Sequence, residues 1–411
     1  MDNCIVCGNK KLNKFLDLGK TALANNFLEP EDLNLIDEEF YPLRVAYCNN
    51  CFHVQLIDHV NPKKMFDNYL YISSASKTLT DHLFSLAKVI TRKITFKRND
   101  LVIDIGSNDG TLLSSFKKID KKLEVLGVEP AKNLVKFANK KNINCVNSYL
   151  DIEVAKGIVS NYGNAKLVTS TNSFPHIQNL YNFMDSVNEL LSDDGVFVLE
   201  AHYLVDLFEQ KAFDTVYHEH ISYWSVGPMQ LLFKNYEFEI FDIERLPVHH
   251  GQIRVWVKKT KNKKYVVSNN VKKLIKLENQ IGLRDKNFYQ TFAKQIYNNK
   301  ELFLKSLSQI KKEGKTIVGY GAPAKGNTLL TFFDIDKTTI PYISDISKLK
   351  QNKFSPGKHI PIVSEKKILE DKPDYVLILA WNFADEIIQQ LSRYRESGGK
   401  FIIPVPSFKI L

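Results

Sequence analysis

The sequence lacks two features that would tie the chain to a membrane or to export. No apolar run reaches the roughly 20 residues needed to span a bilayer, and the first residues, MDNCIVCGNK, contain no apolar signal-peptide core. We therefore expect a cytoplasmic protein with no membrane partner. At 411 residues the chain has room for two or three domains. Its apolar content of 44% and charged content of 25% are typical of a soluble globular protein.

The chain also lacks a basic cluster of the kind that binds nucleic acid. Its formal net charge of +10 comes from 56 basic and 46 acidic residues, but the basic residues are spread along the chain and often adjoin asparagine. This distribution is typical of a solvated surface, and the positive excess favours anionic phosphate substrates. We expect no nucleic-acid partner and a monomer or weak dimer.

Cysteine is scarce, with five residues in the chain, and four of them lie near the N-terminus. Cys4, Cys7, Cys48 and Cys51 form two C-x-x-C pairs, and four thiolates complete the tetrahedral shell of a structural zinc ion. Disulfides are disfavoured in a reducing cytoplasm, while an iron–sulfur or redox site is an alternative. Cys145 stands alone in an apolar stretch and is expected to lie in the core.

The most informative stretch is LVIDIGSNDG, residues 101–110. Its apolar start predicts a buried parallel strand, which breaks into a glycine turn before a helix over 111–119. Glycine allows a ligand to approach the backbone, and the helix N-terminus offers free N–H groups to polar ligand atoms. The next apolar run ends in Glu129, which is placed to accept both hydroxyls of a ribose.

This turn is not the dinucleotide-binding fingerprint, because it reads Asp-Ile-Gly-Ser-Asn-Asp-Gly. It resembles the first motif of class I S-adenosylmethionine methyltransferases. The expected cofactor is therefore S-adenosylmethionine, and a glycine turn that binds nothing is the alternative. The candidate cofactor-binding residues are Asp104, Gly106, Ser107, Asn108, Gly110, Glu129, Pro130, Asn172 and Ser173.

Strand-like and helical segments alternate beyond the glycine turn. We expect strands at 144–146, 166–172 and 195–200 and helices at 134–141, 152–162 and 177–191. This alternation predicts parallel strands with right-handed crossovers, followed by an antiparallel pair at 238–246 and 252–259 on the sheet edge. Asn172, Ser173 and His176 leave the carboxyl end of the fourth strand, the edge over which such sheets bind ligands.

A dense polar segment, Tyr217-His218-Glu219-His220, stands in an otherwise apolar and aromatic stretch. Four consecutive acid–base side chains are costly to bury without partners, so we interpret this segment as part of an active site. A solvated loop is one alternative. A second metal site is another, since His218 and His220 are two positions apart and would share one face of a strand.

Two further segments connect these parts. Tyr69 and Tyr71 share one face of an extended segment before a helix predicted over 79–93, although turn and cap roles explain them equally well. Residues 262–312 are rich in Lys, Asn and Leu with helical periodicity, which predicts connecting helices around a domain boundary.

A second α/β unit begins at residue 316, where GYGAPA follows a predicted strand in the pattern G-x-G-x-x-A. Asp345 supplies an acid after the next strand, and further strands are expected at 375–380 and 400–404. We expect the loop amides and Lys325 to hold a diphosphate, as in a nucleotide sugar. NAD would use the same geometry, so an NAD-dependent oxidoreductase is the rival function.

Taken together, these motifs resemble the deoxysugar C-methyltransferases that act on nucleotide-linked 4-keto-6-deoxyhexoses. The resemblance covers nearly the whole chain in the same order. It includes the cysteine pairs, Leu18-Gly19, Ala24-Asn25, Tyr-x-Tyr with Ser-Ser, DIGSNDG, Glu129-Pro130, Asn172 with His176, Tyr-His-Glu-His, GYGAPAKGN and PG-x-HIP.

The resemblance implies an α/β chain of four parts. These are a zinc-binding domain at 1–65, a class I methyltransferase domain with a catalytic insertion at 66–262, a helical connector at 263–312 and a Rossmann-like domain that binds the nucleotide sugar at 313–411. The implied reaction transfers a methyl group from S-adenosylmethionine to a ring carbon, expected to be carbon 3, through an enolate. Its setting would be deoxysugar or polysaccharide biosynthesis.

The resemblance also implies roles for single residues. His220 would be the base that removes the proton from carbon 3, and Tyr71, His176, Tyr217 and Glu219 would complete the catalytic group. The candidate substrate-binding residues are Tyr69, His218, Arg254, Tyr320, Gly321, Ala322, Lys325, Asn327 and Asp345. A zinc-ribbon protein that recognises or modifies RNA is a further alternative function.

One departure from the family pattern concerns the segment before the last central strand. This chain reads His249-His250-Gly251-Gln252, where many relatives read His-Gly-Gly-Ser. The departure leaves the sugar stereochemistry and the choice between TDP and GDP open, while the implied reaction is unaffected.

Overall fold

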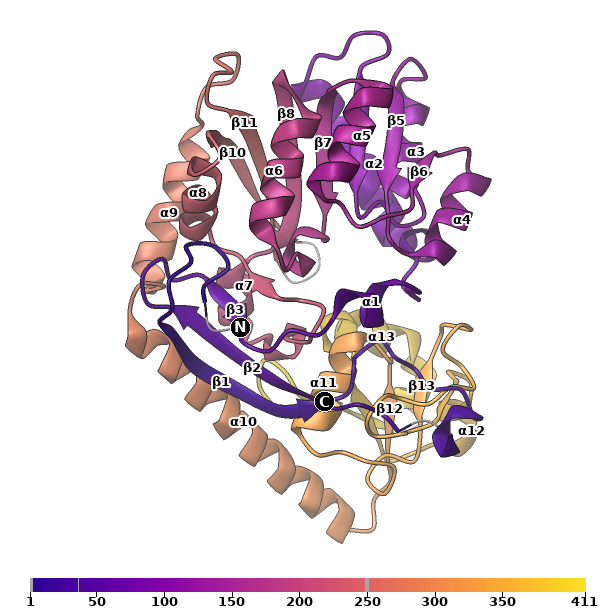
Figure 1. Ribbon diagram of the computed structural model, residues 1–411. Helices are drawn as coiled ribbons and strands as arrows, with labels where there is room; N and C mark the ends of the chain where they lie inside the picture. Colours follow the sequence, from indigo (N-terminus) through magenta and orange to yellow (C-terminus); the bar gives the residue numbers. More distant parts are fainter. Residues whose placement is uncertain (1–2, 36, 248–250) are drawn as a thin grey trace.

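The computed structural model describes residues 3–35, 37–247 and 251–411. The strands within these residues form three sheets with helices around them, so the predicted α/β class is confirmed. Figure 1 shows the central sheet above, with the small N-terminal sheet and the C-terminal unit below it. None of the described helices combines the length and the apolar composition needed to cross a membrane.

The N-terminal part forms a small antiparallel sheet. β1 (Leu12–Thr21), β2 (Tyr41–Cys48) and β3 (Val54–Leu56) pair in sequence order, and the short β9 (Ser222–Tyr223) joins β3 as the fourth strand. Because β9 directly follows the polar segment 217–220, this pairing holds that segment against the N-terminal sheet.

The central sheet has seven strands in the order β10–β11–β8–β7–β4–β5–β6. Its parallel strands are β4 (Leu101–Ile105), β5 (Glu124–Val128), β6 (Cys145–Val146), β7 (Ala165–Thr171) and β8 (Leu191–His202). The predicted antiparallel pair is also present, as β10 (Phe238–Leu246) and β11 (Gln252–Lys259). Every residue of β4 is buried, which explains its unbroken apolar pattern. Cys145, expected in the core, is half-buried and packs against its edge.

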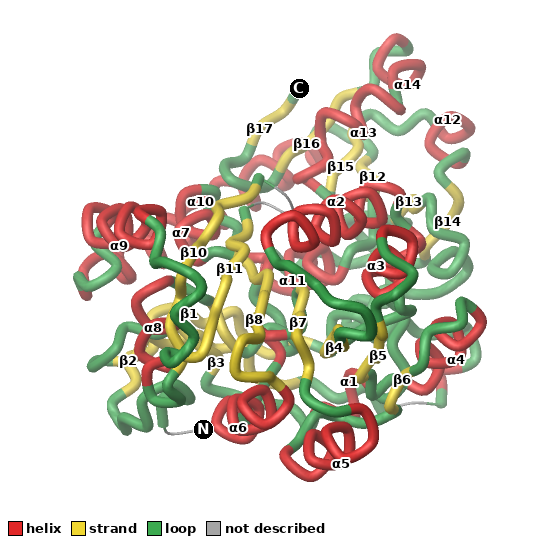
Figure 2. The backbone as a smooth tube through the Cα atoms, turned by 90° about the horizontal axis from the view of Figure 1, so that it is seen from above, coloured by secondary structure: helices red, strands yellow, loops and turns green. Residues whose placement is uncertain are grey.

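Helices cover both faces of the central sheet (Figure 2). α2 (Lys77–Lys93) and α3 (Thr111–Ile119) bury their apolar stripes with Val102, whereas α5 (Ile152–Tyr162) and α6 (Leu180–Leu190) pack on the other face. Alternate residues of β4 therefore serve two cores, as parallel strands between helices require. The other helices around this sheet are α1 (Pro62–Phe66), α4 (Lys132–Lys140), α7 (Leu204–Glu209) and α8 (Val226–Lys234).

Two helices lead from the central sheet to the C-terminal unit. α9 (Asn269–Ile281) is capped by Ser268, and α10 (Lys286–Lys312) is 27 residues long and packs against β1. Its buried residues, among them Phe292, Phe303 and Ile310, follow a helical period. In Figure 1 α10 runs beneath β1 toward the C-terminal unit.

The C-terminal unit is a six-stranded sheet in the order β14–β13–β12–β15–β16–β17. Five strands are parallel: β12 (Ile317–Tyr320), β13 (Ile343–Asp345), β14 (Ile362–Ser364), β15 (Tyr375–Ile378) and β16 (Lys400–Ile403). β17 (Lys409–Ile410) is antiparallel. The helices of this unit are α11 (Ala324–Phe332), α12 (Lys367–Asp371), α13 (Ala384–Gln390) and α14 (Ser392–Glu396).

Candidate functional site

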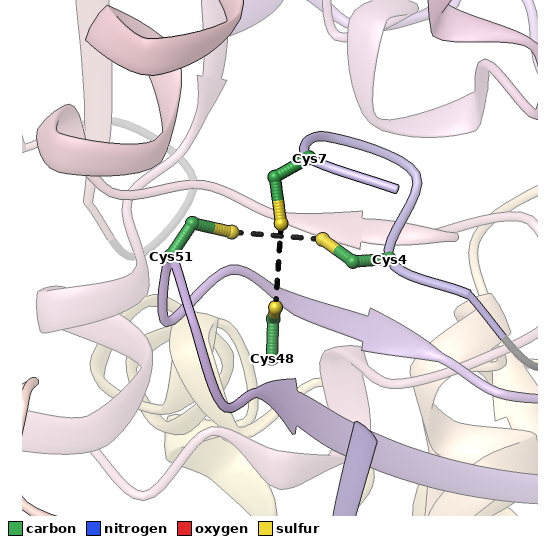
Figure 3. A group of neighbouring side chains, drawn as sticks. All are labelled: Cys4, Cys7, Cys48 and Cys51. Carbon is green, nitrogen blue, oxygen red and sulfur yellow. Dashed lines mark hydrogen bonds between the residues drawn. The ribbon is translucent and has the colours of Figure 1, made fainter. Parts of the chain in front are cut away.

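Four cysteine side chains converge in the N-terminal part (Figure 3). The Sγ atoms of Cys4 and Cys51 are 3.5 Å apart, those of Cys7 and Cys48 are 3.5 Å apart, and all four lie within 4.8 Å of one another. Four sulfurs bound at about 2.3 Å to one zinc ion would be roughly 3.8 Å from each other. The arrangement therefore fits a tetrahedral zinc site with no position left for a substrate.

The backbone of each C-x-x-C pair forms the tight turn that this convergence needs. The Gly8 N–H donates to the Cys4 carbonyl at 2.9 Å, and the Phe52 N–H donates to the Cys48 carbonyl at 3.0 Å. Both turn residues have a positive φ, 69° for Gly8 and 60° for Phe52. The second pair lies where β2 ends and turns toward β3, so the metal site closes one end of the N-terminal sheet.

A large cavity of about 820 Å³ lies between the central sheet and the C-terminal unit. The carboxyl ends of β4, β5 and β7 form one wall, and the loops after β12, β13 and β15 contribute to the opposite wall. Of the candidate cofactor residues, the cavity is lined by Asp104, Gly106, Ser107, Asn108, Glu129, Pro130, Asn172 and Ser173. Gly110 lies outside this lining and precedes α3 in a left-handed conformation.

Glycine at position 106 is required by a close approach within the protein. Its φ is 71°, and an added Cβ would lie 2.5 Å from the Cβ of Ser173. The glycine thus lets the end of β7 approach the turn after β4. This reason comes in addition to the ligand approach that we expected from the sequence, since Gly106 also lines the cavity.

Two acids face the cavity at the ends of β4 and β5. The two carboxylate oxygens of Glu129 accept hydrogen bonds from the backbone N–H groups of Asn108 at 2.8 Å and Ala131 at 2.9 Å. Each oxygen keeps a lone pair for a ligand hydroxyl, which fits a ribose. Asp104 accepts from the Thr169 hydroxyl at 2.7 Å, and burial raises the pKa of Asp104 to about 7.

His220 faces the cavity from the turn before β9. Its Nδ1 lies 2.8 Å from the Thr215 carbonyl and its Nε2 lies 3.0 Å from the Tyr217 hydroxyl. A carbonyl only accepts, so Nδ1 carries the proton and Nε2 accepts from Tyr217. Burial lowers the pKa of His220 to about 4 and raises the pKa of Tyr217 well above 10. Near neutral pH the pair is therefore an uncharged imidazole and a protonated phenol.

Two more histidines surround His220. The ring centroid of His176 is 5.2 Å from that of His220. The ring centroid of His202, the last residue of β8, is 5.1 Å from that of His220. His176 stacks on Phe66, its Nε2 is buried with no partner among the described residues, and burial lowers its pKa well below the usual value. Sequence reasoning missed His202, although a polar residue that ends a buried strand is a signal for this edge.

His218, in the same polar segment, points away from the cavity. Residues 217–220 form a turn rather than a strand, so His218 and His220 do not share the strand face on which the alternative of a second metal site depended. The Nε2 of His218 lies 3.1 Å from the Pro42 carbonyl in the N-terminal sheet, and the residue does not line the cavity. The pairing of β9 with β3 imposes this direction.

Glu219 does not line the cavity but holds two side chains that do. Its carboxylate accepts from the Asn25 amide at 2.7 Å and from the Tyr69 hydroxyl at 2.8 Å, and burial raises its pKa to about 7. Asn25 and Tyr69 both line the cavity, as does Tyr71, which is 47% exposed at the rim. The carboxylate thus positions side chains from two distant segments.

The C-terminal unit contributes two lysines to the cavity. Lys325, at the start of α11, has its Nζ 4.3 Å above the Trp381 ring, and burial lowers its pKa to about 8. Lys350 follows β13, and its Nζ donates to the Ala322 carbonyl at 2.7 Å. Sequence reasoning missed Lys350 because it stands among other lysines and no spacing distinguishes it.

The remaining substrate-binding candidates lie outside the cavity lining, and most have structural partners. Asp345 accepts from the Ala322 and Ser347 N–H groups at 2.6 and 2.7 Å, and the Asn327 amide donates to the Ala24 carbonyl at 2.7 Å. Tyr320 and Gly321 pack in the C-terminal core and against Ala380. Arg254 forms a buried ion pair of 2.7 Å with Glu200.

Part of the segment in which this chain departs from the family pattern can be placed. His249 and His250 lie outside the described residues. The side chain of Gln252 lines the cavity, and its Nε2 donates to the Oδ1 of Asn172 at 2.6 Å.

Family models match three consecutive regions of the chain. Residues 4–66 match a "Putative zinc binding domain", residues 80–243 match a methyltransferase domain, and residues 247–406 match the C-methyltransferase C-terminal domain. The first region contains all four clustered cysteines. Together with the three sheets, these matches confirm the predicted α/β chain with a zinc-binding part, a class I methyltransferase domain and a C-terminal α/β domain.

Known proteins resemble the chain over its whole length or over part of it. C-methyltransferase NovU from Streptomyces niveus is 33% identical over 411 residues, which is 100% of this chain and 97% of that protein. Two solved structures resemble a part of the chain. The plantazolicin methyltransferase BpumL, in complex with a pentazolic desmethylPZN analog and SAH, is 14% identical over 46% of this chain and 87% of that chain, with a TM-score of 0.37. The YcgJ protein from Bacillus subtilis is 16% identical over 51% of this chain and 88% of that chain, with a TM-score of 0.33. The assignment below rests on NovU and the family models.

Removing one sulfur should empty the metal site. In Cys48→Ser we expect loss of the single bound zinc and a lower melting temperature, because three thiolates no longer close the tetrahedral shell that holds the N-terminal sheet. Metal content by mass spectrometry and thermal unfolding measure both effects. The matched control is Cys145→Ser, which should keep its zinc. Full zinc content in Cys48→Ser would contradict the assignment.

Proposed function

Since this chain belongs to the C-methyltransferase family and is therefore an S-adenosylmethionine-dependent enzyme that methylates carbon, we propose that its substrate is a nucleotide-linked 4-keto-6-deoxyhexose. The methyl group would be added to ring carbon 3 through an enolate, in deoxysugar or polysaccharide biosynthesis. The observation that carries this proposal is the uncharged His220 at the cavity, with its Nδ1 proton held by Thr215. The oxidoreductase alternative is not retained, because the family performs methyl transfer.

Methyl transfer to carbon requires a carbon nucleophile, and the residues at the cavity suit its formation. A ketone at carbon 4 acidifies the hydrogen on carbon 3, so a neutral base can remove it as a proton. With Nδ1 protonated, Nε2 of His220 is the ring nitrogen that accepts this proton, once the Tyr217 hydroxyl turns its hydrogen bond from Nε2 to the substrate oxygen. Since its pKa is about 4, the imidazole does not have to lose a proton first at neutral pH.

The negative charge that develops on the carbonyl oxygen needs a donor. Tyr217 keeps its proton because burial raises its pKa well above 10, and its hydroxyl lies 3.0 Å from the His220 Nε2. In this proposal Tyr217 donates to the enolate oxygen. His176, whose Nε2 is buried with no partner among the described residues, lines the same cavity with its ring 5.2 Å from that of His220. Hydrogen bonds among buried side chains such as these stabilise such a charge more than they would in solution.

The cofactor residues meet the requirements of S-adenosylmethionine, which when bound supplies an electrophilic methyl group. Glu129 holds two free lone pairs at the end of β5 for the ribose hydroxyls. Asp104, Ser107 and Asn172 complete this side of the cavity. The proposed base and the cofactor edge thus face one cavity, in which the sugar carbon can meet both.

On the opposite wall, Lys325 and Lys350 are the basic side chains from the C-terminal unit that line the cavity within the described residues. A diphosphate carries charge that two ammonium groups neutralise by charge-assisted hydrogen bonds. In this proposal they hold the diphosphate, so the nucleotide lies against the C-terminal unit and the sugar extends toward His220.

The proposed function is tested by supplying S-adenosylmethionine and a panel of TDP- and GDP-linked 4-keto-6-deoxy sugars to the whole enzyme. We expect a mass gain of one methyl group in at least one sugar nucleotide, at carbon 3 by NMR. A methyl group on oxygen or on a different carbon would contradict the assignment of carbon 3. Methylation of no ketosugar would refute the substrate class.

Removing the proposed base should stop turnover without disturbing the cofactor site. In His220→Asn we expect kcat to fall by about 10²–10⁴-fold, the contribution typical of a general base, while calorimetry still detects S-adenosylmethionine binding. The control is His218→Asn, since His218 contacts the Pro42 carbonyl and not the cavity. If His220→Asn turned over at the wild-type rate, another residue would have to be the base.

A further inference from the structure

Gln252 is the first residue of β11, and among the described residues its side-chain amide has a hydrogen-bond partner for its nitrogen but none for its oxygen. The residue is fully buried, with 0% of its surface exposed, and its Nε2 donates to the Oδ1 of Asn172 at 2.6 Å. Its Oε1 is buried and has no hydrogen-bond partner among the described residues. A buried acceptor without a partner costs free energy. A bound ligand that donates a hydrogen bond to Oε1 would remove this cost and bind more tightly.

The position of Gln252 indicates whether this ligand is the sugar or the cofactor. It lines the cavity and lies opposite His202 in the register of β8 and β11, and the His202 ring is 5.1 Å from that of His220. The strand that leads to Glu129 is four positions away in the sheet, roughly 19 Å at the usual spacing of strands. Gln252 therefore lies next to the proposed base, and it reaches the cofactor side of the cavity only through Asn172, with the proposed ribose site four strands away.

The chemistry of the unpaired atom limits the partner further. An amide oxygen only accepts, so the ligand group must be a hydroxyl or an amine. In the proposed reaction His220 acts at carbon 3, whose ring neighbours are carbon 4 and carbon 2. Carbon 4 carries the ketone, which cannot donate. Carbon 2 is then the ring neighbour that can present a donor, and a hydroxyl on carbon 3 itself is the competing donor that the test distinguishes.

We propose that Gln252 is a specificity-determining residue, which selects ketosugars with a hydroxyl on carbon 2 by accepting its hydrogen bond at Oε1. This inference rests on the proposed function, because it assumes a ketosugar that reacts at carbon 3. The bond from Nε2 to Asn172 holds the Gln252 amide in the orientation that turns Oε1 away from Asn172.

The test compares kcat/KM for two substrates: the 4-keto-6-deoxyhexose nucleotide that the wild-type enzyme methylates and its 2-deoxy counterpart. The wild type should prefer the hydroxylated sugar by about tenfold to a hundredfold, the usual effect of leaving a buried acceptor unpaired. In Gln252→Met, similar in shape but without the acceptor, this preference should disappear through a lower kcat/KM for the hydroxylated sugar.

A second amide in the same cavity provides the matched control. Gln178 also lines the cavity, but its Nε2 donates to the Val60 carbonyl and it does not contact Asn172. Gln178→Met should keep the wild-type ratio between the two sugars. Melting temperatures show whether each variant is folded, and if Gln252→Met is not, Gln252→Asn, which withdraws the acceptor by one methylene, replaces it.

Three results would overturn the inference. One is an unchanged ratio in folded Gln252→Met, and another is a preference that follows the carbon 3 hydroxyl instead. The third is weaker S-adenosylmethionine binding in Gln252→Met with an unchanged ratio, which would assign the amide to the cofactor. These results differ from a failure of the proposed function, in which the wild-type enzyme methylates neither sugar.

Discussion

The site depends on the burial of one imidazole whose proton is held in place. A histidine in water is partly charged near neutral pH, and its proton exchanges between the two nitrogens. Here the Thr215 carbonyl fixes the proton of His220 on Nδ1, and burial removes the charge by lowering the pKa to about 4. The same burial keeps Tyr217 protonated. The proposed base and the proposed donor thus share one desolvated environment, which distant parts of the chain have to build.

Three parts of the chain build it. The pairing of β9 with β3 anchors the segment that carries His220 to the N-terminal sheet, whose end is closed by the cysteine cluster. Glu219 ties Asn25 and Tyr69 together behind the cavity wall, and Asn327 of the C-terminal unit donates to the Ala24 carbonyl beside Asn25. A cysteine cluster that does not line the cavity can therefore support the proposed base by holding the sheet against which its turn packs.

Much of this arrangement could be predicted from the sequence, because local patterns determine it. The unbroken apolar run of β4 and the glycine turn after it identify a parallel strand and the edge where ligands bind, and the cysteine spacing identifies the metal cluster. Partners distant in sequence determine the rest. His218 turns toward the Pro42 carbonyl because β9 pairs with β3, and Arg254 forms an ion pair with Glu200. The spacing of residues in the sequence predicts neither contact. Lys350 reaches the cavity only through the C-terminal fold.

The central claim, a neutral His220 with an unprotonated Nε2, is tested most directly by ¹⁵N NMR of the histidine rings across pH. The chain has 10 histidines, and the spectrum of His220→Asn identifies the signal of His220. The account predicts a protonated Nδ1, an unprotonated Nε2 and a midpoint near pH 4. A midpoint close to 6.5, or a neutral ring with its proton on Nε2, would contradict it.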